Sequence, residues 1–133
     1  MIIKETIQRI GIRQTFGRYR SIIEPWTRPG TVYLVQQGVV LIRQTCDEAE
    51  SFSERRLAIE HKGEGMLINA VEAWRERPYR YSAKAATGVT CLCCDATVLK
   101  SVIERQGKVF EAFEELLEEA DRTATTYGDQ LGV

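Results

Sequence analysis

One stretch decides the fold of this chain: Val32-Tyr33-Leu34-Val35-Gln36-Gln37-Gly38-Val39-Val40-Leu41-Ile42. Its aromatic and β-branched residues favour two β-strands, and Gly38 marks a turn between them, because glycine adopts backbone conformations that other residues resist. From Ile12 to about Cys94, further short apolar runs are separated by glycine, proline and charged clusters. This texture predicts a sandwich or barrel of short strands.

Helices are expected on either side of these strands. Apolar residues at helical spacing predict a helix at 2–10, and the charged segment 72–77 predicts a short one. Asp95 can cap a further helix at 96–104, and the last helix is expected over 109–126 with a stop at Gly128. We expect strands at 12–16, 21–24, 31–36, 39–45, 55–60, 66–69, 80–86 and 89–94, a turn at 24–30 and a solvated hairpin tip at 47–51.

Composition bounds the classes of protein that fit. A chain of 133 residues suits one domain over 1–133, with a β-roll at about 12–94 and C-terminal helices at about 95–127. The net charge of −1 gives no general basic field for nucleic acid. No apolar run approaches the roughly 20 residues of a membrane span, and the N-terminus lacks the pattern of a signal peptide. We therefore expect a cytoplasmic location.

The cysteines favour buried, inert thiols. Cys91 and Cys93 share one face of a predicted strand, while Cys94 points to the other face. Free cysteine is among the most buried residue types. Thiol sensing by these three residues is the alternative. A zinc site needs a second pair of cysteines or several histidines, and His61 is the only histidine, so we predict no metal.

The same shortage of histidine argues against an enzyme. A serine triad or a cysteine nucleophile would depend on His61 alone as its base. A cupin, which shares the texture of a β-roll, needs a histidine cluster with a carboxylate. The pair Gly63 and Gly65 lacks the lysine and serine of a phosphate loop. We therefore expect a protein without catalytic residues.

The last helix carries an apolar stripe with an acidic face opposite. The stripe can pack on the β core, form a dimer seam, or do both, and we expect a mixture. Its residues are Val109, Phe110, Phe113, Leu116, Leu117 and Ala120. The acidic residues of the opposite face are Glu111, Glu114, Glu115, Glu118 and Glu119.

The order of these features resembles the cyclic-nucleotide-binding fold of the catabolite-activator and fumarate–nitrate regulators, over residues 12–122. The motif tyrosine-leucine-valine, two residues, glycine stands at Tyr33–Gly38, after the strand and turn of 21–25. A charged hairpin, a glycine turn at 62–65, a proline-led strand at 78–89 and two helices follow. The resemblance implies an antiparallel β-roll, a regulatory sensor domain and a long C-terminal dimerisation helix.

The ligand segment departs from nucleotide-binding members of that family. Asn69 and Ala70 stand where those members carry glycine and glutamate, so the ribose acceptor is missing. The arginine that pairs with cyclic phosphate in the family falls at Arg77 or Arg80. Cyclic nucleotide is therefore disfavoured, and we expect no cofactor. The residues implied for a ligand are Gly65, Ile68, Asn69, Ala70, Arg77, Arg80 and Ser82.

The predicted function is a ligand-sensing domain of a transcription regulator that forms a homodimer and binds a small effector or protein partner. Regulators of this type carry a helix-turn-helix domain after the long helix, and none follows here, so we expect no direct DNA contact. The main alternative is a pure interaction module with a vestigial pocket. The side chains expected to plug such a pocket are Met66, Leu67, Trp74 and Tyr79.

Overall fold

The computed structural model describes residues 1–25, 30–44 and 59–130, and the side chains of 1–25, 30–43 and 61–120. The hairpin tip expected at 47–51, the first part of the strand expected at 55–60 and Cys46 lie outside the described residues. Within them, each of the predicted strands and helices is present.

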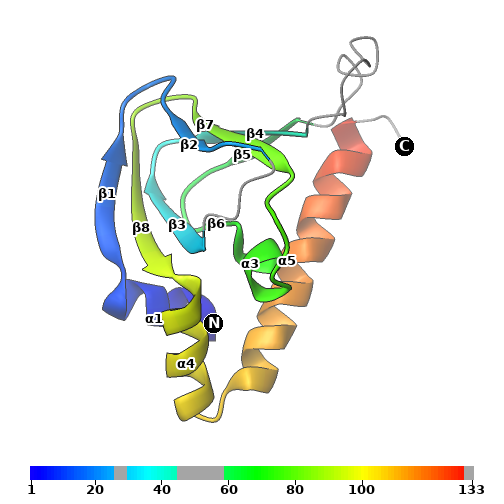
Figure 1. Cartoon of the computed structure of the whole chain (residues 1–133). Coiled ribbons are helices and arrows are strands. Elements are labelled where there is room, and N and C mark those ends of the chain that lie inside the picture. The colour runs from blue at the N-terminus through cyan, green and yellow to red at the C-terminus, as the bar shows by residue number, and fades with distance from the viewer. Residues whose placement is uncertain (26–29, 45–58, 131–133) are drawn as a thin grey trace.

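Eight described strands form the roll, and four described helices flank it (Figure 1). The strands are β1 (Ile12–Phe16), β2 (Ser21–Ile23), β3 (Thr31–Gln37), β4 (Val40–Gln44), β5 (Ile59–Lys62), β6 (Leu67–Ile68), β7 (Tyr81–Ala85) and β8 (Val89–Asp95). The helices are α1 (Ile2–Ile10), α3 (Ala70–Trp74), α4 (Ala96–Arg105) and α5 (Val109–Gln130). Helix α5 runs through Gly128, where the sequence predicted a stop, because glycine weakens a helix without removing its hydrogen bonds as proline does.

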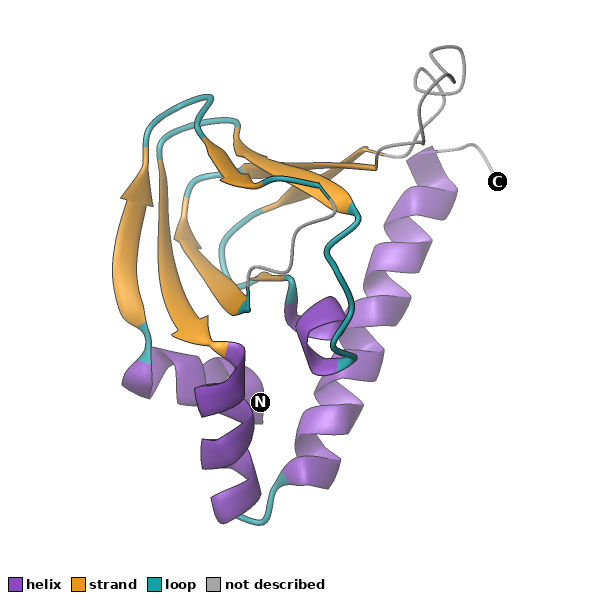
Figure 2. Cartoon of the chain, in the orientation of Figure 1, coloured by secondary structure: helices purple, strands orange, loops and turns teal. Residues whose placement is uncertain are grey.

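The strands form two antiparallel sheets of four strands each, in the orders β1-β8-β3-β6 and β2-β7-β4-β5. Figure 2 shows the strands in the upper part of the molecule, with α5 rising beside them. Strands β3 and β4 belong to different sheets, so the turn at Gly38 carries the chain from one sheet to the other. Gly38 has φ of 91°, and a Cβ there would collide with the carbonyl oxygen of Gly88. Glycine is therefore required at this crossing.

Strand β3 is buried on both faces, which explains its unbroken apolar run. Val32 and Leu34 pack in a core between this sheet and the helices. Tyr33 and Val35 point the opposite way, into a second core inside the roll. Strand β8 repeats the pattern in register beside it, with its residues alternating between the two cores. These two paired strands form the shared wall of both cores.

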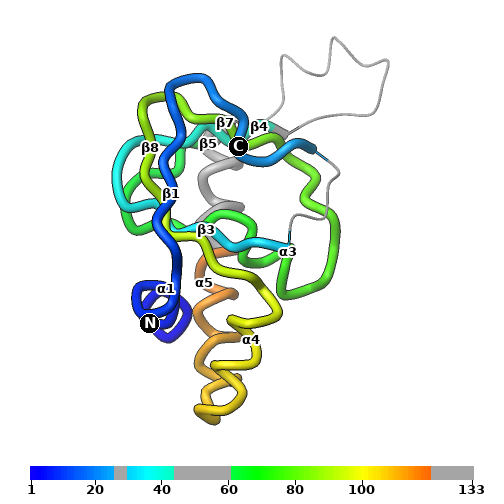
Figure 3. Tube along the Cα trace, turned by 60° about the vertical axis from the view of Figure 1, so that its left-hand side comes forward, coloured from blue at the N-terminus to red at the C-terminus, as the bar shows by residue number. Residues whose placement is uncertain are grey.

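Helix α1 packs against α4 and α5, far from it in sequence, at the lower end of the molecule (Figure 3). The carboxylate of Glu115 on α5 accepts the backbone N–H of Ile3 at 2.8 Å and that of Lys4 at 3.3 Å. These N–H groups lie in the first turn of α1, where the helix itself supplies no acceptor. Burial raises the pKa of Glu115, while the bonds from Ile3 and Lys4 oppose that rise.

Helix α5 has three faces where the sequence suggested two. Of the predicted apolar stripe, Leu116 is buried in the helical core and Ala120 is half-buried. The other members of the stripe are exposed: Val109, Phe110, Phe113 and Leu117. Two glutamates of the predicted acidic face, Glu115 and Glu119, are buried, and each accepts a hydrogen bond from another element. Among the described residues, no helix is long and apolar enough to cross a membrane.

Candidate ligand pocket

A pocket of about 260 Å³ lies between the roll, helix α3 and helix α5. Helix α5 contributes Glu119 and Ala120 to its wall, and all other wall residues come from the roll, from α3 or from the segments beside α3. The apolar part of the wall consists of Ile42, Leu67, Ile68, Ala70, Val71 and Ala120. The polar part consists of Lys62, Asn69, Glu72, Arg75, Tyr79, Tyr81 and Glu119.

Asn69 begins α3 with a left-handed backbone, φ 69°. Asparagine is one of the few residues other than glycine that adopt this conformation readily. Its side chain is 6% exposed, and its Nδ2 donates to the carbonyl of Thr31 at 2.8 Å. That bond fixes the orientation of the amide. Its Oδ1 is buried and has no hydrogen-bond partner among the described residues.

Glu72, at the next turn of α3, carries a second buried oxygen in the same state. Its Oε2 has no partner within the described part of the chain. Buried polar atoms in folded proteins are nearly always hydrogen-bonded, so two unpaired acceptors in one wall need an explanation.

An ion pair joins the roll to α5 across the pocket. Lys62 Nζ lies 3.3 Å from Glu119 Oε1, and their side chains are 7% and 5% exposed. The same oxygen accepts the backbone N–H of Leu67 at 3.3 Å. A buried pair of this kind is costly to break, because the remaining charge is left without a partner. The pair therefore holds α5 against β5 and β6.

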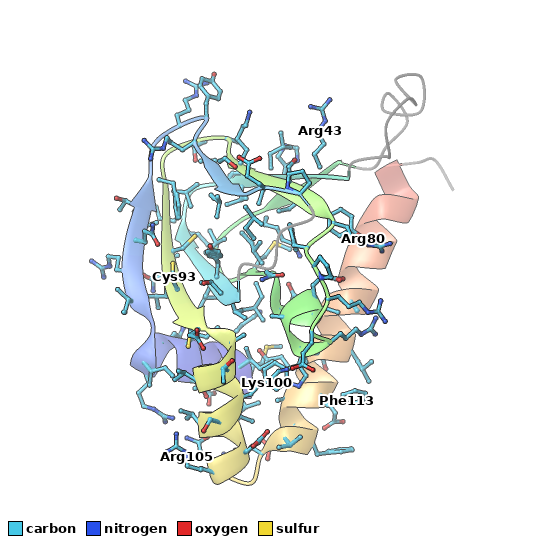
Figure 4. All side chains as sticks on the ribbon, viewed as in Figure 1. Arg43, Arg80, Cys93, Lys100, Arg105 and Phe113 are labelled. Atoms are coloured by element: carbon cyan, nitrogen blue, oxygen red, sulfur yellow. The ribbon has the colours of Figure 1, made fainter. Side chains whose placement is uncertain are left out.

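Two tyrosines form an aromatic part of the wall. The rings of Tyr79 and Tyr81 meet edge to face, with centroids 5.5 Å apart and planes at 74°. Both are on one side of the extended segment that leads into β7, and Arg80 between them is exposed. Figure 4 shows Arg80 pointing away from the strands of the roll.

The structure brings together three of the seven residues predicted to bind ligand. Ile68, Asn69 and Ala70 line the pocket. The other four lie outside its wall. Gly65 borders a separate hollow beside α1, and Arg77 lines a groove between α3 and α4. Arg80 and Ser82 are excluded by strand alternation, which turns Tyr79 and Tyr81 toward the pocket instead.

The plug expected for a vestigial pocket is incomplete. Leu67 and Tyr79 belong to the wall, but space remains between them. Met66 is engaged elsewhere, where its Sδ accepts the N–H of Gly63 at 3.3 Å. Trp74 packs against the helical core, with Lys100 Nζ 5.5 Å from its ring centroid. The geometry thus favours an open pocket over a filled one.

The cysteines of β8 are poorly placed for thiol chemistry. Cys91 and Cys94 are buried, and Cys93 is half-buried with its Sγ 3.4 Å from Gln14 Oε1 (Figure 4). Burial, followed by the nearby Cys93, raises the pKa of Cys91 to about 12. Burial also raises the pKa of Cys93 and of Cys94. Each shift lowers the fraction of reactive thiolate, which favours the inert interpretation.

Metal ligation has no support in the described ranges. They contain no group of three or more histidine, cysteine, aspartate or glutamate side chains placed to hold a metal ion. His61 is exposed on β5, opposite Leu41 of β4.

Comparison with solved structures identifies the fold. No family model matches the chain, and no curated protein matches it. The catabolite activator protein of Thermus thermophilus superposes with a TM-score of 0.73 at 19% identity, covering 98% of this chain and 59% of that protein. The N-terminal domain of a transcriptional regulator from Streptomyces coelicolor A3(2) gives 0.65 at 16% identity, covering 91% and 81%.

The EAL enzyme Bd1971 in its cAMP-bound form gives a TM-score of 0.62 at 18% identity, covering 86% of this chain and 29% of that enzyme. The chain thus spans 59% of the length of the Thermus protein and a smaller part of Bd1971. Likeness at these identities concerns the fold. The chain has the cyclic-nucleotide-binding-like fold, an antiparallel β-roll with flanking helices, as the sequence resemblance predicted.

Proposed function

We propose that this chain is a ligand-sensing regulatory domain, in which a small molecule in the pocket changes how α5 packs against the roll. The observation that carries this proposal is the composition of the wall: α5 supplies Glu119 and Ala120, and the roll, α3 and the segments beside α3 supply the other residues. A molecule bound there contacts both parts. It can therefore have different affinities for two arrangements of α5, which is the requirement for a ligand to shift such an equilibrium.

The fold and the chemistry of the wall support binding over catalysis. The structural neighbours include a catabolite activator and part of a transcriptional regulator, and a regulatory role is the one we extend to this chain. The described wall includes no serine, threonine, cysteine or histidine. Its carboxylate Glu119 is paired with Lys62. The wall therefore offers hydrogen-bonding and apolar contacts to a bound molecule, and no serine, threonine or cysteine nucleophile among its described residues.

We also propose that a second copy of the chain covers the exposed row on α5. Phe110, Phe113 and Leu117 are 73%, 51% and 44% exposed and follow each other at intervals of three and four residues. Apolar residues at these intervals are typical of the seam of a two-stranded coiled coil. The same row on a second copy of α5 can therefore pack against this one. Figure 4 shows Phe113 pointing away from the roll, where a partner can reach it.

Thermal melting with a set of small molecules, cyclic AMP and cyclic GMP among them, tests the sensor. A compound present at about 100 times its dissociation constant should stabilise the fold by about 2.7 kcal/mol. Hydrogen exchange with that compound should then protect both 67–69 and 116–120. Ala120→Leu, which narrows the pocket, should abolish the effect, whereas Glu118→Leu on the exposed face should retain it. Protection of the roll alone would contradict coupling to α5.

Sedimentation equilibrium tests the dimer. Phe113→Glu should convert a dimer to a monomer, because it places a charge in the proposed seam. Val98→Glu is the matched control, since Val98 is a comparably exposed apolar residue on α4. An equal effect of the two substitutions, or a wild-type monomer, would refute this arrangement.

A further inference from the structure

We infer that the pocket takes a small ring-bearing molecule that donates hydrogen bonds, an aromatic amine or amidine, and discriminates against phosphate and carboxylate anions. This inference rests on the proposed sensor function, because it names the ligand class of the same pocket. Three observations support it: the unpaired oxygens of Asn69 and Glu72, the balance of charges in the wall, and the rings of Tyr79 and Tyr81.

The two acceptors are the first element. Asn69 and Glu72 line the pocket, and Asn69 Oδ1 and Glu72 Oε2 are buried and lack a donor among the described residues. Two donors of the same segment have other partners: Asn69 Nδ2 donates to the carbonyl of Thr31, and the Leu67 N–H donates to Glu119. Leaving a buried acceptor unpaired costs free energy, and a bound donor recovers it. A molecule that brings a donor to either atom therefore gains a hydrogen bond that the described part of the chain leaves unmade.

The charges of the wall point the same way. Lys62 and Arg75 are offset by Glu72 and Glu119, and the charge nearest the roll, Lys62, is held by Glu119. A bound anion would meet two carboxylates, and pairing it with Lys62 would break the buried ion pair with Glu119. The two arginines that the family resemblance offered for a phosphate, Arg77 and Arg80, lie outside the wall, and Arg75, the arginine within it, is exposed. A neutral or singly positive molecule avoids these costs.

Shape and size complete the description of the ligand. Tyr79 and Tyr81 offer ring surfaces at 74° to each other, and Leu67 and Val71 add apolar surface. A flat ring can stack on one tyrosine and meet the edge of the other. The volume of about 260 Å³ is just below the range of roughly 300–1,000 Å³ for drug-sized ligands. One or two fused rings with an amino or imino edge suit this space.

Nuclear magnetic resonance titration with matched probes tests the inference. The amines are adenine, 2-aminobenzimidazole and 2-aminoquinoline; the anions are benzimidazole-2-carboxylate, quinoline-2-carboxylate and cyclic AMP. We expect the amines to bind at least about tenfold more tightly than the anions, the effect of one hydrogen bond to a charged or buried partner. Asn69→Gly, which keeps the left-handed backbone, and Glu72→Ala should each weaken the amines by about tenfold.

Controls separate this inference from the sensor itself. Glu64→Ala, an exposed glutamate outside the wall, should leave every affinity unchanged. Glu72→Gln keeps the size of the side chain and covers the case in which the alanine variant does not fold. Tighter binding of the anions, or amine affinities indifferent to both Asn69 and Glu72, would overturn the inference while leaving a sensor pocket in place. Failure of every probe at millimolar concentration would contradict the ligand class and the pocket together.

Discussion

Replacing Glu115 with leucine tests how α5 holds the N-terminal helix. The carboxylate of Glu115 accepts the N–H groups of Ile3 and Lys4, at 2.8 Å and 3.3 Å. Leucine has a similar volume and a good helix propensity, so the substitution removes the acceptor with little change in packing or in α5. Both N–H groups then lose their partner at a buried contact.

The structure sets the size of the effect. Each buried donor left unpaired costs about 1–3 kcal/mol, and the burial of leucine returns part of that. We expect Glu115→Leu to lower the free energy of unfolding by about 2–4 kcal/mol, or about 8–16 °C in Tm for a domain of this length. Glu115→Gln retains one acceptor oxygen and should lose about half as much.

Urea and thermal unfolding of the two variants measure these values. Glu114→Leu is the control, because Glu114 is the exposed neighbour on the same helix and should change stability by less than about 0.5 kcal/mol. A leucine variant as stable as the wild type would refute the role given to this carboxylate. So would a glutamine variant as damaged as the leucine variant.

The remaining predictions concern pH, the strand crossing and the thiols. Because burial raises the pKa of Glu115 above 4.5, the folded chain binds that proton more tightly than the unfolded chain. Its contribution to stability should therefore fall as pH rises through the interval above 4.5, and urea midpoints of Glu115→Gln across that interval should lack the fall. Gly38→Ala should lower the free energy of unfolding in urea by at least about 1–3 kcal/mol, because φ is 91° and the added Cβ would collide with the carbonyl of Gly88. Gly63→Ala is the control and should be nearly neutral, because no atom beyond its chain neighbours lies within 4 Å of the added Cβ. In a Cys46→Ser variant, Cys91 should not react with Ellman's reagent until denaturant is added, because a pKa of about 12 leaves almost no thiolate at neutral pH. Rapid labelling of the folded protein would instead support thiol sensing.

The strands were predictable from sequence because their burial leaves a strong local pattern. Val32–Val35 is apolar without alternation, and the structure buries both faces of β3 between two cores. A strand of that kind can be recognised without its partners, since each residue by itself must be apolar. The turn at Gly38 was equally local, because the backbone conformation there excludes other residues.

The wall of the pocket was less predictable, because its polar members meet across long separations. Lys62 and Glu119 are 57 residues apart, and either side chain alone has the appearance of a solvated surface charge. Tyr79 and Tyr81 did carry a signal, since residues two apart on an extended segment share a face. The same alternation turns Arg80 away from the pocket. The family resemblance pointed to Arg80 nevertheless, because Arg80 was assigned by its match to the arginine of the family.

Helix α5 makes three kinds of contact from residues that lie close together along its sequence. Residues around Leu116 pack in the helical core, Glu119 and Ala120 reach the pocket, and Phe113 and Leu117 face outward. Helices transmit displacement along and across their axis because their backbone hydrogen bonds keep them stiff. On the proposed function, a molecule that moves Ala120 also moves Phe113 and Leu117, which lie less than two turns away on the same helix. On this proposal the seam between two copies would be the readout of the pocket. The ion pair of Lys62 with Glu119, which joins α5 to the roll, would then set the position from which α5 departs.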